Sequence, residues 1–257
     1  MLYLQYVRIS FRSFCQYRLN TLFVTVTQMI NALLSFAAIY LLFERFGNIK
    51  GWTLGEISLC FAVTNASFAI TETFSRGFDL FSQLVVSGDF DRLMLRPRST
   101  VLQVLGSKLD FTRLSKLAVS FAVISYAVTV MDTQWNALKV LTVLLMLTSG
   151  FFVFSGMFIL GATVCFWTVQ GLEFINIFTD GGRELASYPL PIYQKWLARF
   201  FTFVIPFGSF NYLPLLYVTG RSSNPMYMLA SLLGIAFIVP CLLVWNFGVR
   251  HYLSTGN

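Results

Sequence analysis

Two acidic residues in a largely apolar stretch of the C-terminal half are the first candidates for chemistry. Glu173 and Asp180 are seven residues apart, and this spacing puts both carboxylates on one face of a helix. Acidic side chains inside a membrane are costly and usually functional, so the pair could bind and release protons during transport. The run from Asp180 to Glu184 contains two glycines and is also compatible with a wet, partly unwound segment. We favour this second interpretation.

The other chemical patterns argue against catalysis by this chain. Asp89 and Asp91 have the D-x-D spacing of some metal-dependent sugar transferases, but a surface ion pair with Arg92 is the simpler interpretation. There is one histidine, His251, and the four cysteines are far apart, which argues against a zinc site or a disulfide framework. The P-loop pattern GxxxxGK[ST] is absent from the sequence. We therefore expect no catalytic residue, no metal site and no cofactor in this chain.

A third group of polar side chains lies inside the first long apolar run, residues 22–43. Thr25, Gln28 and Ser35 fall within a narrow arc of a helix, and Asn31 borders them. Such a face can be a helix seam held by hydrogen bonds, or it can be the wall of a substrate path. The two interpretations overlap, because a cavity between two chains is also a helix seam.

The elements that would position these residues are membrane helices. The chain has 257 residues, 56% hydrophobic and only 11% charged, with a mean hydropathy of +0.70. A soluble domain of this length has a charged coat of about a quarter of its residues. Long uncharged runs instead predict an all-α membrane protein with a single transmembrane domain over residues 1–257. We expect six transmembrane helices, at about 22–43, 55–73, 115–132, 139–163, 168–188 and 225–248.

Two further segments are expected to be helical without crossing the membrane. Residues 1–20 place arginine and glutamine on one side and apolar side chains on the other, the pattern of an N-terminal interfacial helix. Residues 191–220 contain an uncharged run long enough to span, but Pro206 and Pro214 favour broken half-helices. We therefore expect a broken, re-entrant helical hairpin at 191–220, between spans 5 and 6.

Basic residues predict the topology. The net charge is +7, and the basic residues cluster between the apolar runs, so we interpret them as topology signals and contacts to anionic lipid rather than as a nucleic-acid site. Many of them lie in the 74–114 loop, whereas the loops on the other side carry few. The positive-inside rule then places both termini and the 74–114 loop in the cytoplasm.

The 74–114 loop contains a short helical pattern that ends at Arg96, because a proline disfavours helix at the residue before it. A new helix then leads into span 3. This arrangement could be an ordinary cytosolic turn or a docking element for a partner, and the residues alone leave both open.

The order of these elements resembles the ABC-2 type permeases, the membrane-spanning subunits of ABC exporters. The loop from Ser87 to Ser99 is similar to that family's segment of glycine, helical leucines, proline and a small residue. The run from Tyr188 to Pro214, with Trp196 and several prolines, is similar to the family's re-entrant region before the last span. The resemblance covers nearly the whole chain.

The resemblance implies a permease subunit, not itself an enzyme, that exports an amphipathic or hydrophobic substrate. A separate ATPase subunit would bind ATP and Mg, and a second permease chain, identical or different, would complete the path. The implied location is the bacterial inner (cytoplasmic) membrane, among membrane lipids. The implied coupling helix contains Ser87, Gly88, Asp91, Arg92, Leu93, Leu95 and Arg96, and the implied path and dimer interface contain Thr25, Gln28, Asn31 and Ser35.

The alternative function is a proton-coupled secondary transporter that uses Glu173 and Asp180. Such a transporter needs no ATPase. Purification in mild detergent distinguishes the two functions, because only the ABC permease would bring an ATPase with it.

Overall fold

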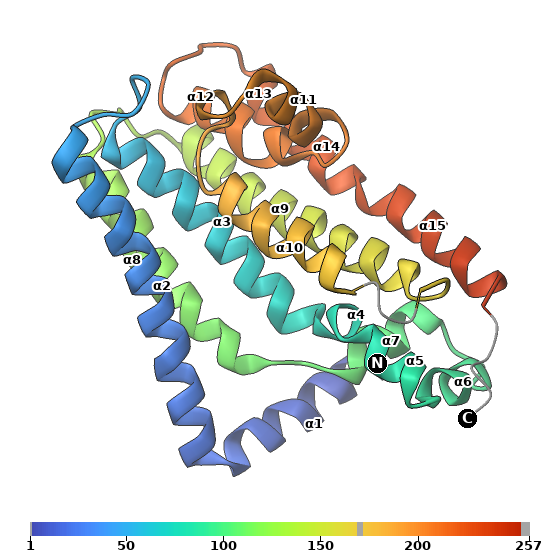
Figure 1. The fold of residues 1–257 in the computed structure, drawn as a ribbon. Helices are drawn as coiled ribbons and strands as arrows, with labels where there is room; N and C mark the ends of the chain where they lie inside the picture. Colours follow the sequence, from blue (N-terminus) through green and yellow to red (C-terminus); the bar gives the residue numbers. More distant parts are fainter. Residues whose placement is uncertain (1, 169–171, 253–257) are drawn as a thin grey trace.

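The computed structural model describes residues 2–168 and 172–252, and the described chain is built of helices (Figure 1). The longer helices are α1 (Leu2–Gln16), α2 (Arg18–Phe46), α3 (Leu54–Phe74), α8 (Ser115–Val130), α9 (Ala137–Val164), α10 (Leu172–Ala186) and α15 (Ile238–Arg250). The shorter ones are α4 (Arg76–Asp79), α5 (Phe81–Val86), α6 (Asp89–Met94), α7 (Thr100–Ser107), η1 (Phe111–Leu114), η2 (Leu190–Ile192), α11 (Lys195–Phe203), η3 (Gly208–Tyr212), α12 (Leu213–Val218), α13 (Met226–Leu229) and α14 (Ser231–Ala236). We call the end with α1 and α4 to α7 the lower end, and the end with α11 to α13 the upper end, as in Figure 1.

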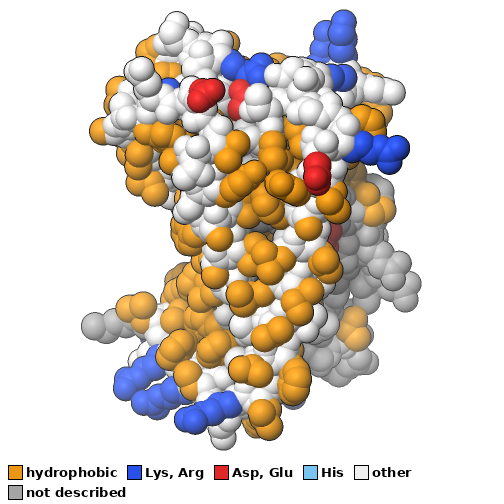
Figure 2. All heavy atoms as spheres, turned by 90° about the vertical axis from the view of Figure 1, so that its left-hand side faces the viewer, with side chains coloured by type: hydrophobic (Ala, Val, Ile, Leu, Met, Phe, Trp, Pro, Cys, Tyr) orange, Lys and Arg blue, Asp and Glu red, His pale blue; other side chains and the backbone are white. Residues whose placement is uncertain are grey.

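Five helical segments of the described chain are long and apolar enough to cross a membrane: Arg18–Phe46, Leu54–Phe74, Phe111–Val130, Ala137–Val164 and Met226–Arg250. They lie where five of the six spans were predicted, and the third begins earlier because η1 runs directly into α8. Figure 2 shows the face on which α2 lies, with hydrophobic side chains over its middle and charged side chains at its two ends. This distribution is typical of a membrane-spanning bundle.

The central helix is α3, although its sequence is the least apolar of the five candidates. Nearly every residue of α3 is buried. Its hydroxyls donate to backbone carbonyls of its neighbours: Ser67 Oγ lies 3.1 Å from the Leu147 oxygen of α9, and Thr64 Oγ1 lies 2.9 Å from the Ala186 oxygen of α10. A Cβ on Gly150 would lie 2.5 Å from Ser67 Oγ, so only glycine allows α9 to pass this close. Small and hydroxylated residues thus hold the bundle together at α3.

The outermost helix is α2, which packs against α8 and α3 along one narrow stripe. Only Ala32, Ile39 and Phe43 of this helix are fully buried. The rest of its surface, largely apolar, faces away from the chain. In one copy of the protein, α2 therefore leaves a long face open to lipid or to another chain.

The fifth predicted span, 168–188, is shorter than expected within the described residues. There α10 has 15 residues, roughly 22 Å at 1.5 Å per residue, against a hydrocarbon core of roughly 30 Å. It ends at Ala186, just before Tyr188 and Pro189, and it carries Asp180, Arg183 and Glu184. Full crossing by this segment stays a prediction.

The predicted hairpin at 191–220 corresponds to two helical pieces, Lys195–Phe203 and Gly208–Val218, bent by 87°. Pro206 lies in the break and Pro214 at the start of α12, as expected for residues that interrupt a helix. Between them, η3 is a π-helical turn whose Asn211 Nδ2 donates to Thr64 Oγ1 and to the Ala186 oxygen, both at 2.7 Å. The bend is therefore tied to the middle of the bundle. Its re-entrant position in a membrane, like the interfacial position of α1, stays a prediction.

Candidate functional site

The predicted docking element is a short surface helix anchored by one aromatic side chain. Gly88 has φ of 70°, a left-handed conformation that suits glycine and turns the chain from α5 into α6. Phe90 then points inward and is fully buried. Its ring centroid lies 4.8 Å from that of Phe81 and 6.2 Å from that of Trp245 in α15. The two aspartates of the D-x-D pattern thus lie on either side of a buried phenylalanine.

The other side of α6 faces outward. Leu95 is 87% exposed, and Met94 beside it is also exposed. Leu93 instead packs half-buried against the core, so the predicted pair Leu93 and Leu95 does not lie on one surface. Of the other predicted docking residues, Ser87, Arg92 and Arg96 are exposed, and Gly88 and Asp91 are half-buried.

A second set of contacts joins α6 to the membrane-spanning helices. The buried Gln103 amide donates to the carbonyl oxygens of Leu93 and Arg98, each at 3.1 Å, and so holds the stretch after α6 against α7. The Trp245 indole of α15 packs edge-on against Phe78 at 5.0 Å and donates to Thr100 Oγ1 at 3.3 Å. The sequence analysis missed Trp245. Its only signal is an aromatic residue in the last span close to the basic end.

A cluster of charges that the sequence analysis also missed lies at the lower end of α3. The buried Glu72 carboxylate meets three cations: Lys116 Nζ at 2.7 Å, Arg113 Nη1 at 3.0 Å and Arg76 Nη1 at 3.4 Å. Arg76 also pairs with Asp79 at 2.8 Å, and Arg113 with Asp110 at 3.1 Å. We call these six residues the Glu72 cluster. Arg76, four residues after Glu72, was a readable signal, whereas Arg113 and Lys116 are distant in the sequence.

The Glu72 cluster closes the two ends of the α4–α7 segment onto the bundle. Arg76 and Asp79 lie in α4, where that segment begins, and Asp110 lies where it ends. The Asp110 amide also donates to the Thr73 carbonyl oxygen at 3.3 Å. A displacement of α6 would therefore reach α3 through this cluster and α15 through Trp245.

Two carboxyl groups of the cluster outside the spans have opposite pKa shifts. Burial raises the pKa of Asp79, which the nearby Arg76 only partly offsets, and the negative charges of Asp180 and Glu72 add to the rise. Burial acts the same way on Asp110, but hydrogen bonds from Thr112 and Arg113 outweigh it and lower the pKa of this carboxyl. Asp110 is thus a firmly ionised anchor, and Asp79 is the carboxylate least stabilised in its charged form.

A cavity of about 290 Å³ opens beside the Glu72 cluster, between α3, α9 and α10. Asp180 of α10 lines it, together with Glu72, Asp79 and the three basic residues. The structure thus brings Asp180 close to Glu72. The side chain of Glu173, its predicted partner for proton transfer, lies outside the described residues.

The predicted path residues of α2 do not share one environment. Thr25 and Gln28 are half-buried, on the side that packs against the rest of the chain, whereas Asn31 and Ser35 are exposed. The Ser35 hydroxyl donates to the Asn31 carbonyl within the helix, at 3.0 Å. Thr25 Oγ1 is buried and has no hydrogen-bond partner in the described chain.

Comparison with known proteins agrees with this architecture. Residues 29–256 match the family described as ABC-2 family transporter protein. Comparison with curated proteins and with solved structures gives no significant match. The family match begins within α2 and covers the rest of that helix and the other four candidate spans. It also includes the α6 region and the bent helix pair. The chain therefore belongs to the ABC-2 family of membrane transporter proteins.

Proposed function

We propose that this chain is the permease subunit of an ABC exporter and moves an amphipathic or hydrophobic substrate. A separate ATPase subunit would supply the energy, and a second permease chain would complete the path. Membership of the ABC-2 family supports this function. The single observation that carries the docking proposal is α6, a helix held by the buried Phe90 that leaves Leu95 and its basic neighbours exposed.

The exposed side of α6 has the composition of a protein-binding surface. Leu95 is almost fully exposed, and Arg92 and Arg96 flank it. An apolar anchor surrounded by basic side chains suits a groove with an apolar floor and acidic walls. Because Phe90 and Gln103 hold α6 from behind, pressure on Leu95 would move the α4–α7 segment as one piece.

The second permease chain is proposed from α2. Much of its surface is apolar and open, and this surface also exposes the polar side chains of Asn31 and Ser35. A polar group left unpaired in hydrocarbon costs several kcal/mol, in the range of about 2–7. A second chain packed along α2 would cover Asn31 and Ser35 and supply a partner for the Asn31 amide. Thr25 and Gln28, which are half-buried against this chain, would lie behind that interface. The interface would then form one wall of the path.

The proposed topology places the lower end, with both termini and α6, on the cytoplasmic side of a bacterial inner membrane. The basic residues of α1 and of the α4–α7 segment favour this orientation. It also puts α6 on the side where ATP is available to a partner ATPase.

The test reverses the charges next to Leu95. In Arg92→Glu combined with Arg96→Glu, we expect at least about a tenfold loss of co-purifying ATPase and of transport, because both replacements would face acidic groove walls. The amount of chain in the membrane should not change, since both side chains are exposed. The matched control is Arg45→Glu with Arg199→Glu, two exposed arginines away from α6. Normal transport by the first double variant would refute docking at α6.

A further inference from the structure

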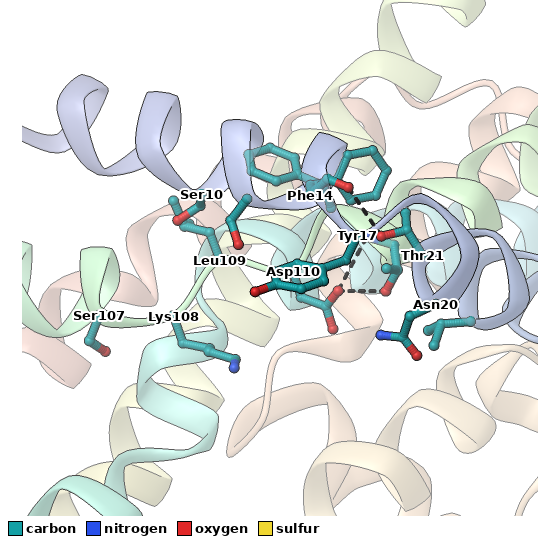
Figure 3. Close-up of a pocket in the computed structure, with 13 residues that line it drawn as sticks. Ser10, Phe14, Tyr17, Asn20, Thr21, Ser107, Lys108, Leu109 and Asp110 are labelled. Atoms are coloured by element: carbon teal, nitrogen blue, oxygen red, sulfur yellow. Dashed lines mark hydrogen bonds between the residues drawn. The ribbon is translucent and has the colours of Figure 1, made fainter.

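The elbow between α1 and α2 borders an open, partly polar recess of about 420 Å³ that the proposed transport mechanism does not use (Figure 3). Its walls are α1, the first turn of α2 and residues 107–112. The chain turns at Tyr17, which leaves the helical conformation with φ of −97° and ψ of 61°. Thr21 Oγ1 closes the turn by donating to the Phe14 carbonyl oxygen at 3.1 Å, and Phe14 packs edge-on against Phe111 at 6.1 Å. These two contacts fix the angle between α1 and α2.

Several hydrogen-bond donors line the recess, and all of them except Ser10 are exposed. The side chains of Ser10, Ser13, Tyr17, Asn20 and Lys108 line it, and none of them bonds to any residue that the structure describes. In Figure 3, Tyr17, Asn20 and Lys108 extend from different segments towards the same opening.

The one carboxylate in the wall of the recess is already occupied. Asp110 Oδ1 accepts from the Thr112 amide at 3.2 Å and from its hydroxyl at 2.5 Å, and Oδ2 accepts from Arg113 Nε at 3.1 Å. Lys108 has no ion pair within the described chain, so its charge stays unbalanced. A group with negative charge and several acceptor oxygens, such as a phosphate diester, matches this set of donors.

A second hollow, of about 430 Å³ and mostly apolar, lies on the other side of the same elbow. Leu22 and Val26 of α2 line it, with Arg18 also in its wall. Phe14 and Thr21 line both hollows, so the polar recess and the apolar groove meet at the elbow. A ligand that fills both must carry an anionic head and an apolar tail.

The position of the elbow identifies the source of such a ligand. Leu22 and Val26 lie at the start of the apolar stretch of α2, next to the amphipathic and basic α1. A membrane phospholipid presents its phosphate at the level where its acyl chains begin, and anionic lipids concentrate at basic juxtamembrane segments. A free phosphate would occupy the recess alone and leave the groove empty.

We propose that the α1–α2 elbow binds one anionic phospholipid, with its phosphate on Lys108 and the neighbouring hydroxyls and an acyl chain along Leu22 and Val26. The bound lipid holds α1 in the plane of the membrane. This site does not depend on the ATPase or on the identity of the exported substrate.

The test measures lipid binding to the purified full-length chain by native mass spectrometry. Phosphatidylglycerol should bind at one site more tightly than phosphatidylcholine does. Lys108→Ala should weaken phosphatidylglycerol binding about fivefold, the effect of one basic residue at an anionic surface, and leave phosphatidylcholine binding unchanged. Lys195→Ala removes an exposed lysine far from the elbow and should change neither.

A second variant and two competitors make the outcome decisive. Ser13→Trp fills the recess without removing a charge and should also weaken phosphatidylglycerol binding, so the test does not rest on one substitution. Glycerol phosphate, which lacks acyl chains, should compete poorly. The proposal is overturned if inorganic phosphate displaces the lipid at millimolar concentration, if wild type binds both lipids equally, or if neither variant weakens binding.

Discussion

The two ends of α3 each carry a buried glutamate, and the two are used differently. At the upper end, Glu56 accepts from the Thr53 amide at 2.8 Å in a capping box and from Arg221 at 2.6 and 2.8 Å. Arg221 stacks over the Trp52 ring at 4.2 Å and donates to the Gly51 carbonyl at 2.5 Å. One cation and a few neighbouring residues therefore saturate this carboxylate.

At the lower end, Glu72 is shared among three cations and also borders a cavity. Its partners come from α4, η1 and α8, three elements that lie at the junction between the bundle and the α4–α7 segment. The upper glutamate thus holds two loops together, whereas the lower one joins the α4–α7 segment to the spans. Glutamate thus makes local contacts at one end of α3 and connects several elements at the other end.

The largest effect on stability is expected from a substitution of Glu72, at the lower end of α3. Glu72→Gln leaves the buried Lys116 without a counter-charge and removes one partner from the half-buried Arg76 and Arg113. The change should destabilise the chain by about 3 kcal/mol, the cost of removing one partner from a buried ion pair. We also expect less ATPase to co-purify. Thermal unfolding in detergent and pull-down of the partner measure the two effects.

The control for this variant is Glu184→Gln, which alters an exposed glutamate that pairs with its neighbour Arg183. It should shift neither measurement. In the double variant Glu72→Gln with Lys116→Met, part of the lost stability should return, because one buried charge is removed. A Glu72→Gln chain as stable as wild type would show that the two ends of α3 do not differ in the proposed way.

A smaller effect is expected at the upper end. Glu56→Gln keeps the cap, because glutamine also serves in a capping box, and loses only the charge of the Arg221 pair. Arg221 is 36% exposed, so water screens this pair and the loss should be about 1 kcal/mol. Thermal unfolding should show this shift while ATPase association stays normal. Loss of association without unfolding would contradict a purely local role for Glu56.

The smallest effect is expected for Asp79→Asn, which tests the weakest member of the Glu72 cluster. Since burial raises the pKa of Asp79, the folded chain keeps this proton to a higher pH than the unfolded chain does. The free energy of unfolding therefore falls as Asp79 loses its proton. This loss occurs as the pH rises from the usual pKa of 3.8 through the raised pKa of the folded chain. Wild type should gain stability relative to Asp79→Asn when the pH is lowered through this window.

Unfolding at several pH values checks this prediction. Asp110 has the opposite sign, because its lowered pKa makes its contribution present above the usual value and lost as the pH falls. A pH profile of Asp110→Asn should therefore diverge from wild type in the other direction. Identical profiles for both variants would contradict the opposite pKa shifts of the two groups.

Much of the fold could be predicted from the residues in order. Five of the six predicted spans coincide with helices long and apolar enough to cross, and the break near Pro206 lies in the expected segment. A short helix within Ser87–Arg96 was also expected, and α6 lies there, while its docking to a partner stays a prediction. Each of these features depends on neighbours in the sequence, and their free energies add along the chain.

Which side chains of these elements face inward, and what they contact there, could not be predicted. Helical spacing does not show that Phe90 meets Trp245, or that Leu93 turns inward while Leu95 stays out. The α2 face is a similar case, because Thr25 and Gln28 share an arc with Ser35 but lie against the chain while Ser35 is exposed. Which residues of an amphipathic arc are covered depends on the neighbouring helix, which the arc itself does not specify.

The sequence by itself determined the class of protein and the place of five apolar segments, because transfer of residues into a membrane depends on composition over short windows. Only the tertiary structure decided that the least apolar span, α3, would be the central one. The hydroxyls of Thr64 and Ser67 and the two glutamates are stable there because α9, α10, Arg221 and the Glu72 cluster supply partners from distant parts of the chain. A buried polar group is stabilised by the partner that folding brings to it, and that pairing is not contained in any local stretch of sequence.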